Sequence, residues 1–427
     1  MSPTGSFTSL EDWLPWLESL SPREIVLGLE RVQDVLQRLA LARPARVIHV
    51  AGTNGKGSSV AMLEAILRAD GIRTGCYTSP HVLRYNERIR IDGQPASDAQ
   101  ILQAFVTVEA AREDVPLTYF EFGTLAALVA FAAAGAETLV LEVGLGGRLD
   151  AVNAVEPDAG LITNISLDHC AWLGNDRESI AMEKASIMRR STPVVFGSED
   201  VPASIPACAS EAGADLILAG KDFDYAVNSA RDDTWTWHGQ QTRIEALQRP
   251  ALAGDIQLQN AAAVLALVEA MNLLHLLTPA LINKAFGELD LPGRFQLIDK
   301  RCQWLLDVAH NAAAARVLAE SLSGLSIAGN ITAIIGMQAD KDVQGITAPM
   351  CELVDNWIAI TVAGPRGEPA VSLAHDIANQ CNKPCLIAAD LPQAMQVADS
   401  SARRDDLILV TGSFFAVGPA LEWLQTK

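Results

Sequence analysis

Basic and aromatic side chains are scarce in this chain. Aromatic residues make up 5% of its 427 residues and charged residues 19%, and 32 Lys and Arg are outnumbered by 51 Asp and Glu, which gives a net charge of −19. Proteins that bind nucleic acid present basic patches to the phosphate backbone, so this balance argues against a nucleic-acid partner. It also means that an anionic ligand would need a local basic pocket.

Long apolar runs are missing as well. The longest, residues 122–136, is too short to span a membrane and is bracketed by Glu121 and Glu137, so we interpret it as a helix of the core. The first residues include Glu11, Asp12 and Glu18, and they have neither the basic start nor the apolar centre of a secretory signal. The sequence therefore predicts a cytoplasmic protein with no membrane partner. Because no coiled-coil seam points to assembly, we expect a monomer.

Cysteine is the third scarce residue. The chain has seven cysteines, an odd number, and their spacing is not that of a metal site. We therefore expect reduced thiols, most of them buried. The seven residues are Cys76, Cys170, Cys208, Cys302, Cys351, Cys381 and Cys385.

What the chain does have is core material for more than one domain. Hydrophobic residues make up 49% of the sequence, and 427 residues exceed what one core usually holds. This composition suits an α/β protein whose parallel strands are buried on both faces. The Pro-Gly pair in Leu291-Pro292-Gly293-Arg294-Phe295 interrupts both regular structures, and the pattern restarts after it. We therefore divide the chain into residues 1–293 and 294–427.

Apolar runs that alternate with helical stretches predict a mostly parallel sheet in each domain. Tryptophans at 235 and 237 suggest a small antiparallel insertion in the first domain, and helical periodicity dominates residues 1–45. In the first domain one predicted strand opens the stretch 46–59, and the others are residues 138–143, 160–165, 194–196 and 216–218. In the second the predicted strands are residues 304–308, 331–335, 357–362, 385–388 and 407–410.

Residues 46–59, RVIHVAGTNGKGSS, predict a buried strand, a glycine-rich loop and the start of a helix. The glycines allow backbone N–H groups to turn inward, and the helix presents its positive end to the same place, so a phosphate would bind there. Lys56 adds a charge, and Ser58 or Ser59 offers a hydroxyl to a magnesium ion. The stretch departs from the usual phosphate-loop pattern, because Gly57 separates the lysine from the serine. A tight turn is the simpler alternative, but a turn alone has no use for the lysine and the serines.

Polar residues follow several predicted strands, where open α/β sheets keep their active sites. Glu142 lies at the end of strand 138–143 and is a candidate metal ligand, and His169 follows strand 160–165, although magnesium prefers oxygen ligands. Lys184, in a helix predicted over residues 177–190, is either a solvated charge or points back at this edge. Three arginines at 84, 88 and 90 are either a solvated face or the basic patch of an anionic substrate.

Eight short motifs occur in the chain in a fixed order. Over nearly the whole chain they resemble the folylpolyglutamate synthase family, and most closely its bifunctional bacterial members, which are also dihydrofolate synthases, within the Mur ligase superfamily. The motifs are GTNGKGS (52–58), TSPH (78–81), RYNERI (84–89), LEVGLGGRLDA (141–151), LDH (167–169), EKA (183–185), LPGRF (291–295) and DVAHN (307–311).

The resemblance implies a P-loop-type, mostly parallel sheet with flanking helices, followed by a smaller Rossmann-like α/β domain that binds glutamate. It implies an ATP-dependent ligase that adds L-glutamate to dihydropteroate and to the glutamate tail of folates. The reaction would pass through an acyl phosphate and release ADP and phosphate. Mg²⁺ at two sites is the implied cofactor beside ATP.

The resemblance also implies roles for individual residues. Lys56, Lys184 and His310 would be catalytic, and Lys184 would be a carbamate (carboxylysine), which requires a neutral amine and therefore a lowered pKa. ATP would be bound by Thr53, Asn54, Gly55, Lys56, Gly57, Ser58, Asn260, Arg294 and Asp307. Metal would be bound by Ser58, Ser79, Glu142 and His169. Substrate would be bound by Thr118, Tyr119, Phe120, Glu121, Leu149, Asp150, Ala151, Leu27, Arg84 and Ser413.

The two activities depend on residues 25–32, which resemble the loop that closes over dihydropteroate in bifunctional members. Two positions near the implied glutamate site depart from the family: Ala312 where many relatives have proline, and Phe415 where relatives often have histidine. The alternatives are a monofunctional folylpolyglutamate synthase, a Mur-type ligase acting on a cell-wall nucleotide, and a nucleotide-binding protein without ligase activity.

Overall fold

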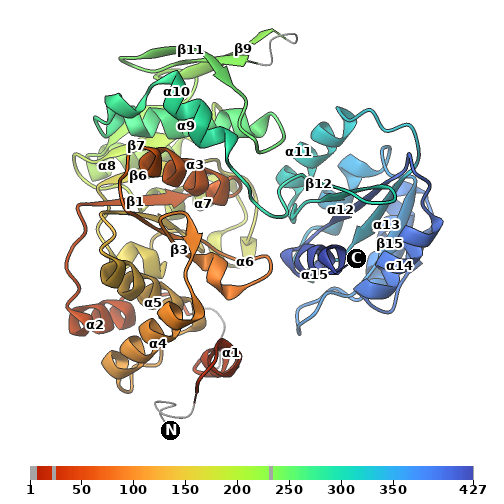
Figure 1. The fold of residues 1–427 in the computed structure, drawn as a ribbon, viewed down its shortest axis with the longest axis horizontal. Coiled ribbons are helices and arrows are strands. Elements are labelled where there is room, and N and C mark those ends of the chain that lie inside the picture. Colours follow the sequence, from red (N-terminus) through yellow and green to blue (C-terminus); the bar gives the residue numbers. More distant parts are fainter. Residues whose placement is uncertain (1–6, 22–25, 230–233, 427) are drawn as a thin grey trace.

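The computed structural model describes residues 7–21, 26–229 and 234–426, so the first residue of the 25–32 stretch lies outside the described part. The chain forms two lobes that stand side by side (Figure 1). Each contains a mostly parallel sheet with flanking helices, which confirms the predicted fold class. In the part of the chain that is described, no helix is long and apolar enough to cross a membrane.

The N-terminal lobe is built on an eight-stranded sheet of order β4-β3-β2-β5-β1-β6-β7-β8, in which only β3 and β4 are antiparallel to their neighbours. The central strand β1 pairs in parallel with β5 and β6, and Val50 lies opposite Glu142. The loops that follow these three strands therefore leave the sheet at one edge. The strands are β1 (Arg46–Ala51), β2 (Thr74–Tyr77), β3 (Ile89–Ile91), β4 (Gln94–Pro95), β5 (Thr138–Glu142), β6 (Ala159–Ile162), β7 (Pro193–Phe196) and β8 (Asp215–Leu218).

Helices cover both faces of this sheet, because its strands carry apolar side chains on both faces. Val47 and Ala51 of β1 pack into one core, and Ile48 and Val50 pack into the other. The first core is shared with α1 (Leu10–Ser19), α2 (Glu30–Leu39), α4 (Asp98–Arg112), α5 (Tyr119–Ala134), α7 (Arg177–Ala185) and α8 (Ser204–Ala212). The second is shared with α3 (Lys56–Ala69), α9 (Ile256–Ala270) and α10 (Pro279–Gly287).

The antiparallel insertion predicted around the two tryptophans is confirmed. It is a three-stranded sheet of β9 (Asp224–Ser229), β10 (Thr234–His238) and β11 (Arg243–Gln248). Trp235 and Trp237 are fully buried, and the ring N–H of Trp237 donates to Ala262 O at 3.1 Å, which attaches the small sheet to α9.

The C-terminal lobe contains a six-stranded sheet of order β12-β13-β17-β14-β15-β16. The five predicted strands are present, and β12 (Gln296–Asp299) is an unpredicted antiparallel edge strand. Its residues are only half-buried or exposed, so it lacks the apolar run that marks the others. The other strands are β13 (Gln303–Leu306), β14 (Ile331–Ile335), β15 (Asn356–Ala359), β16 (Cys385–Ile387) and β17 (Leu407–Thr411). The helices are α11 (Ala312–Ser323), α12 (Val343–Thr347), α13 (Ala370–Cys381), α14 (Leu391–Ser401) and α15 (Phe414–Gln425).

Three expectations are wrong. Of the seven cysteines, Cys76 and Cys302 are buried and the other five are half-buried, so most are not buried. Cys351 and Cys381 form a disulfide rather than two reduced thiols, because α13 packs against α12, which leads through the 3-10 helix η4 (Ala348–Met350) to Cys351, and the two Cα atoms lie 4.9 Å apart. The helix predicted over 177–190 ends at Ala185. There the Ser186 hydroxyl donates to Glu183 O at 2.6 Å, and such a local bond competes with helical continuation.

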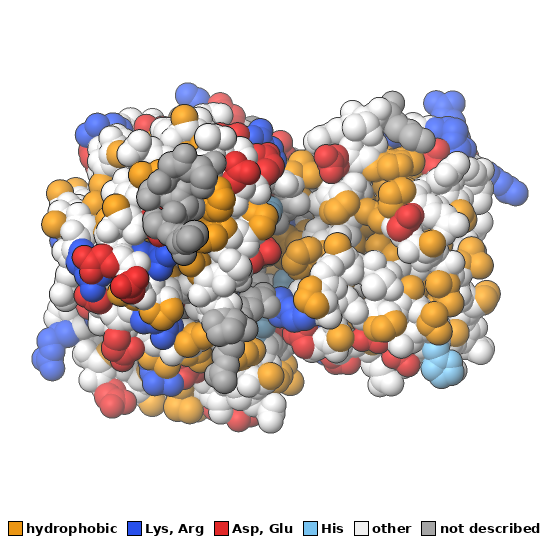
Figure 2. All heavy atoms as spheres, turned by 90° about the horizontal axis from the view of Figure 1, so that it is seen from below, with side chains coloured by type: hydrophobic (Ala, Val, Ile, Leu, Met, Phe, Trp, Pro, Cys, Tyr) orange, Lys and Arg blue, Asp and Glu red, His pale blue; other side chains and the backbone are white. Residues whose placement is uncertain are grey.

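The two lobes touch. Val82 and Leu83 of the N-terminal lobe pack against the apolar core beneath α15, and a side chain on Gly418 would lie 2.1 Å from Val82 O. In Figure 2 a furrow separates the lobes, and basic and histidine side chains reach its surface.

Candidate active site

The loop between β1 and α3 is folded as a phosphate-binding loop would be. Gly52 and Gly55 have φ angles of 140° and 84°, which other residues rarely adopt. A Cβ atom at Gly52 would lie 1.8 Å from Thr163 Oγ1, and one at Gly55 would lie 2.6 Å from Asn260 Oδ1. Helix α3 begins at Lys56 without a side-chain cap, so its first N–H groups are available to an anion.

Three charged side chains converge on this loop. The Lys56 ammonium donates to Gly52 O at 3.2 Å and Thr53 O at 3.1 Å, and it lies 3.9 Å from Glu142 Oε1. A Cβ atom on Gly57 would lie 3.9 Å from Glu142 Oε2 and 4.0 Å from Arg294 Nη2. The loop therefore faces Glu142, at the end of β5, on one side and Arg294, which follows the Pro292-Gly293 pair between the lobes, on the other.

Glu142 is a buried carboxylate at the end of β5. It accepts a hydrogen bond from Ser79 N at 3.2 Å, and burial raises its pKa although Lys56 opposes the rise. Charge buried with so few partners is costly, and a bound cation would relieve that cost. Glu142 therefore has the environment expected of a metal ligand.

Lys184 of α7 points back at the phosphate loop. Its ammonium is buried and donates to Gly52 O at 2.9 Å, the same carbonyl that accepts from Lys56. Burial, together with the charge of Lys56, lowers the pKa of Lys184 to about 7. A large neutral fraction of this amine is therefore present near neutral pH, as carbamate formation requires.

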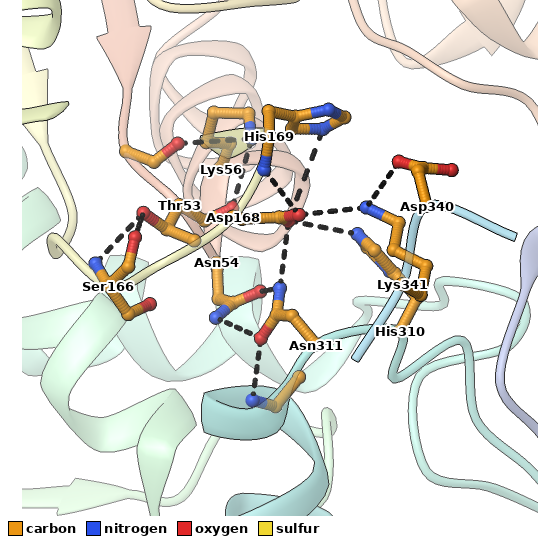
Figure 3. Close-up of polar contacts among 12 residues, drawn as sticks. Thr53, Asn54, Lys56, Ser166, Asp168, His169, His310, Asn311, Asp340 and Lys341 are labelled. Carbon is orange, nitrogen blue, oxygen red and sulfur yellow. Dashed lines mark hydrogen bonds and ion pairs between the residues drawn. The ribbon is translucent and has the colours of Figure 1, made fainter. Parts of the chain in front are cut away.

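Five side chains join the two lobes, and we call them the cross-lobe cluster: Asn54, Asp168, His310, Asn311 and Lys341 (Figure 3). Lys341 Nζ lies 2.8 Å from Asp168 Oδ1, and Asn311 Nδ2 donates to Asp168 Oδ2 at 3.1 Å. Asn54 and Asn311 exchange two hydrogen bonds, at 2.9 and 3.1 Å. The phosphate loop thereby contacts the second lobe directly.

Electrostatics in this cluster favour an ionised Asp168 and neutral imidazole at His169. Burial alone would raise the pKa of Asp168, but the hydrogen bond with the His310 ring and the charge of Lys341 help to outweigh it, and the pKa lies well below its usual range. Burial lowers the pKa of His169 to about 4. His169 is thus neutral at physiological pH and able to bind a metal ion through nitrogen.

The C-terminal lobe contributes a second group of polar residues. Asp307 accepts hydrogen bonds from Phe295 N and Ala309 N, both at 2.8 Å, and burial raises its pKa. The Arg294 guanidinium lies 5.0 Å from the ring centre of Phe414. Ser413, which precedes that ring, caps α15 by accepting from Phe415 N at 3.1 Å.

The residues predicted to bind the pterin substrate gather at the start of α5. Thr118 is the N-cap of this helix, and its hydroxyl accepts from Glu121 N. Phe120 packs against Tyr77, with ring centres 5.8 Å apart, and its ring occupies the space that a side chain on Gly144 would need. Asp150 is buried close by, and burial raises its pKa to about 6.

Comparison with known proteins places these features in one family. The model of the Mur ligase middle domain matches residues 50–268, and that of the Mur ligase glutamate ligase domain matches residues 293–414. The dihydrofolate synthase/folylpolyglutamate synthase of Escherichia coli is 40% identical over 419 residues, which cover 98% of this chain and 96% of that protein. This chain belongs to the Mur ligase family.

Solved structures agree with this assignment. Escherichia coli FolC in complex with DHPP and ADP has a TM-score of 0.92 to this Mur ligase at 39% identity, and each chain is covered to 98%. A bifunctional folylpolyglutamate synthase/dihydrofolate synthase with Mn, AMPPNP and L-glutamate bound has a TM-score of 0.90 at 42% identity, again with 98% of each chain covered. The resemblance read from the motifs is thereby confirmed.

Most of the predicted site residues of this Mur ligase lie together, but two stand apart. Arg84 is exposed and pairs with Asp98 at 3.2 Å on the surface, and within the described residues it contacts no other predicted site residue. Leu27 is 38% exposed on the segment before α2. Their predicted roles in substrate binding stay predictions.

The structure also adds residues to which the motifs gave no role. Asp168 and Lys341 were visible only as polar residues after strands, and it is the packing of the lobes that pairs them. Arg88, rather than Arg84, lies among the substrate segment's rings, 5.7 Å from the centre of Tyr85 and 5.5 Å from that of Tyr119. Its signal in the sequence was the arginine cluster, which did not distinguish its members.

Proposed function

We propose that this Mur ligase adds L-glutamate to dihydropteroate, which makes dihydrofolate, and to the glutamate tail of folates, with ATP hydrolysed to ADP and phosphate. The observation that carries the proposal is the convergence on Gly57 of the Glu142 carboxylate and the Arg294 guanidinium, beside the Lys56 ammonium. A cationic loop that faces a buried carboxylate suits a nucleotide's terminal phosphates and a divalent cation.

The chemistry follows from the placement of these groups. A carboxylate oxygen of the acceptor attacks the γ-phosphorus of ATP, the bond to the β,γ-bridging oxygen breaks, and ADP leaves. The amine of glutamate then attacks the carbonyl carbon of the acyl phosphate, phosphate leaves, and the amine loses a proton. We assign Lys56 and the loop N–H groups to the phosphates, since fixed positive charge of this kind is usually the largest catalytic contribution.

A divalent metal ion belongs to this scheme, and the residues present fit it. Within the described chain no three His, Cys, Asp or Glu side chains gather to form a metal site by themselves, so phosphate oxygens and water must complete the coordination, as is usual for Mg²⁺. We propose two sites, with Ser58 at one and Ser79, Glu142 and His169 at the other. Bound metal neutralises charge on the phosphates and the acceptor carboxylate.

The second lobe completes the site. We propose that Asn260, Arg294 and Asp307 contact ATP together with loop residues 53–58, and that His310 and Ser413 serve the glutamate. A site between lobes 1–293 and 294–427 protects an acyl phosphate from water, because closing excludes solvent. Glu142 is buried at the end of β5, and Asp307 is half-buried after β13.

Three further assignments belong to the proposal. Lys184 acts as a carbamate beside the metal site, where a carbamate's two oxygens replace an ammonium charge. Residues 118–121 and 149–151, with Leu27 and Arg84, bind the pterin-bearing acceptor. The enzyme works as a monomer in the cytoplasm.

A phosphate-release assay tests the proposal. Purified chain is supplied with ATP, Mg²⁺ and glutamate, and with either dihydropteroate or tetrahydrofolate, and the product is identified by mass. We expect phosphate release with both acceptors and only in the presence of glutamate, because the amine must open the acyl phosphate. Turnover on one acceptor alone would contradict the bifunctional assignment, and glutamate-independent hydrolysis would contradict the ligase.

A further inference from the structure

Arg31 joins two segments that are far apart in the sequence. It is the second residue of α2, and its Nη2 atom donates to Glu121 Oε1 at 2.7 Å and to Val26 O at 2.8 Å. Its Nε atom donates to Glu121 Oε2 at 3.4 Å. One guanidinium thus donates to a carboxylate on α5 through two nitrogens and also donates to a backbone carbonyl of the segment before α2.

Glu121 is itself fixed in place. Its side chain is 5% exposed, and Oε2 accepts from Thr118 N at 2.7 Å, so the carboxylate closes the capping box at the start of α5. A carboxylate in the first turn of a helix also interacts favourably with the helix dipole. Arg31 therefore binds to a rigid point.

The segment on the other side has little else to hold it. Among the described residues, the backbone of residues 26–28 makes one hydrogen bond, in which Val26 O accepts from Arg31. Gly28 has a φ of 150°, and the N-cap of α2, Leu29, makes no side-chain capping bond. The conformation of this segment depends on Arg31 more than on its own backbone.

Both segments that Arg31 joins carry residues assigned above to the acceptor. Leu27 lies directly after Val26, and Thr118, Tyr119 and Phe120 lie directly before Glu121. These hydrogen bonds of Arg31 reach neither the phosphate loop nor the second lobe. Disturbing Arg31 should consequently change the binding of the acceptor and spare the binding of ATP and glutamate.

We propose that Arg31 is a positioning residue that sets the acceptor-binding segment 26–29 against the start of α5 and thereby determines affinity for the pterin-bearing acceptor. This inference rests on the proposed function, which supplies the acceptor. The planar guanidinium is needed, because it binds a carboxylate with two nitrogens and a carbonyl at once, which the point charge of lysine does not reproduce.

The test is the kinetics of Arg31→Gln with each substrate varied in turn. We expect the KM for dihydropteroate or tetrahydrofolate to rise by about ten-fold or more, as expected for loss of a charged hydrogen-bond pair. The KM values for ATP and glutamate should stay within about two-fold of wild type. Arg31→Lys, which keeps the charge, should show a smaller rise in the same KM and serves also if the glutamine variant fails to fold.

Arg38→Gln is the matched control. Arg38 lies on the same helix, pairs with Asp34 and Glu113 and donates to the Ala111 and Arg112 carbonyls, so the variant removes an equal charge away from the acceptor segments. Its three KM values should equal those of wild type. An unchanged acceptor KM in both Arg31 variants, or an equal rise in all three KM values, overturns the inference. A wild-type chain that turns over neither acceptor overturns the proposed function instead.

Discussion

Lys56, which we propose binds the phosphates, does little to support the fold. In the described part of the chain, the hydrogen bonds and ion pair of its ammonium go to the carbonyls of its own loop and, at 3.9 Å, to Glu142. The backbone of that loop is held instead by glycine packing against Thr163 and Asn260. Removing the lysine should therefore leave the loop in place and remove charge from the phosphates.

We expect Lys56→Ala to lower the rate of ATP turnover on the order of 10³-fold, because a fixed charge at a transferring phosphoryl group is lost. The unfolding free energy should change by less than about 1 kcal/mol. Phosphate release and thermal denaturation measure the two quantities. Lys221→Ala, which removes an exposed lysine of the same lobe, is the control. Phosphate release at the wild-type rate would show that Lys56 does not bind the phosphates.

The pKa of Lys184 predicts that the enzyme's activity depends on carbon dioxide, and that this dependence changes with pH. The pKa of about 7 means that the amine is mostly protonated at pH 6 and mostly neutral at pH 8, and only the neutral amine adds CO2. In buffer stripped of CO2, adding bicarbonate should therefore restore activity at pH 8 and have little effect at pH 6. Carbon-13 NMR of the labelled carbamate reports the modification directly. Equal activity with and without bicarbonate at pH 8 would refute the carbamate.

At the scale of elements, secondary structure and its connections decide which residues share the catalytic edge. Strands β1, β5 and β6 are parallel neighbours, so the phosphate loop, Glu142 and His169 emerge together although they lie far apart in the chain. The C-terminal lobe repeats this arrangement with Asp307 after β13 and Thr411 at the end of β17. In both lobes, therefore, polar residues of the candidate site follow the carboxyl ends of parallel strands.

The disulfide between Cys351 and Cys381 should stabilise the C-terminal lobe. It closes a loop with a sequence separation of 30, for which the chain-entropy model gives about 3.6 kcal/mol. Cys381→Ser, or reduction of the wild type, should lower the unfolding free energy of this lobe by a comparable amount in denaturant titrations. Cys385→Ser, which alters a half-buried free thiol nearby in the sequence, should have a much smaller effect. Identical titrations with and without reductant would contradict the prediction.

At the scale of the whole molecule, the cross-lobe cluster couples the two lobes. Asp168 and Lys341 have side chains 9% and 7% exposed, so their ion pair is buried at the junction. Removing one member of a buried pair leaves the other charge without compensation, which costs about 3 kcal/mol or more. The cost should appear in the closed arrangement of the lobes that the reaction requires.

Asp168→Asn should therefore lower kcat by about 10²-fold while the affinity for an ATP analogue changes little, because Asp168 is not among the residues assigned to ATP. Combining it with Lys341→Met should cost less than the sum of the single effects, and a double-mutant cycle measures that coupling. Asp200→Asn, which breaks an exposed pair with Arg177, should leave kcat unchanged. Additive effects of the two changes would show that the pair does not act as a unit.

Local pattern alone was sufficient for the fold class, the phosphate loop and most strands. A buried parallel strand needs a short apolar run, and a phosphate loop needs glycine where φ is positive, so both leave a mark within a few residues. Strands β2, β3, β4 and β12 were not predicted, and the predicted end of α7 was wrong. β4 and β12 are edge strands, which need no apolar run, and a single serine bond can end a helix.

Pairings across the molecule were decided by the tertiary structure. Arg31 and Glu121 are 90 residues apart, and Asp168 and Lys341 are 173 apart, so no local pattern relates them. Composition likewise did not show which cysteines pair or which of the clustered arginines lies near the substrate segment. Packing joins Cys351 to Cys381 and places Arg88 among aromatic rings. The sequence determined which backbone elements form, because their periods are short. The packing of those elements determined which side chains meet, because contact depends on topology and not on distance along the chain.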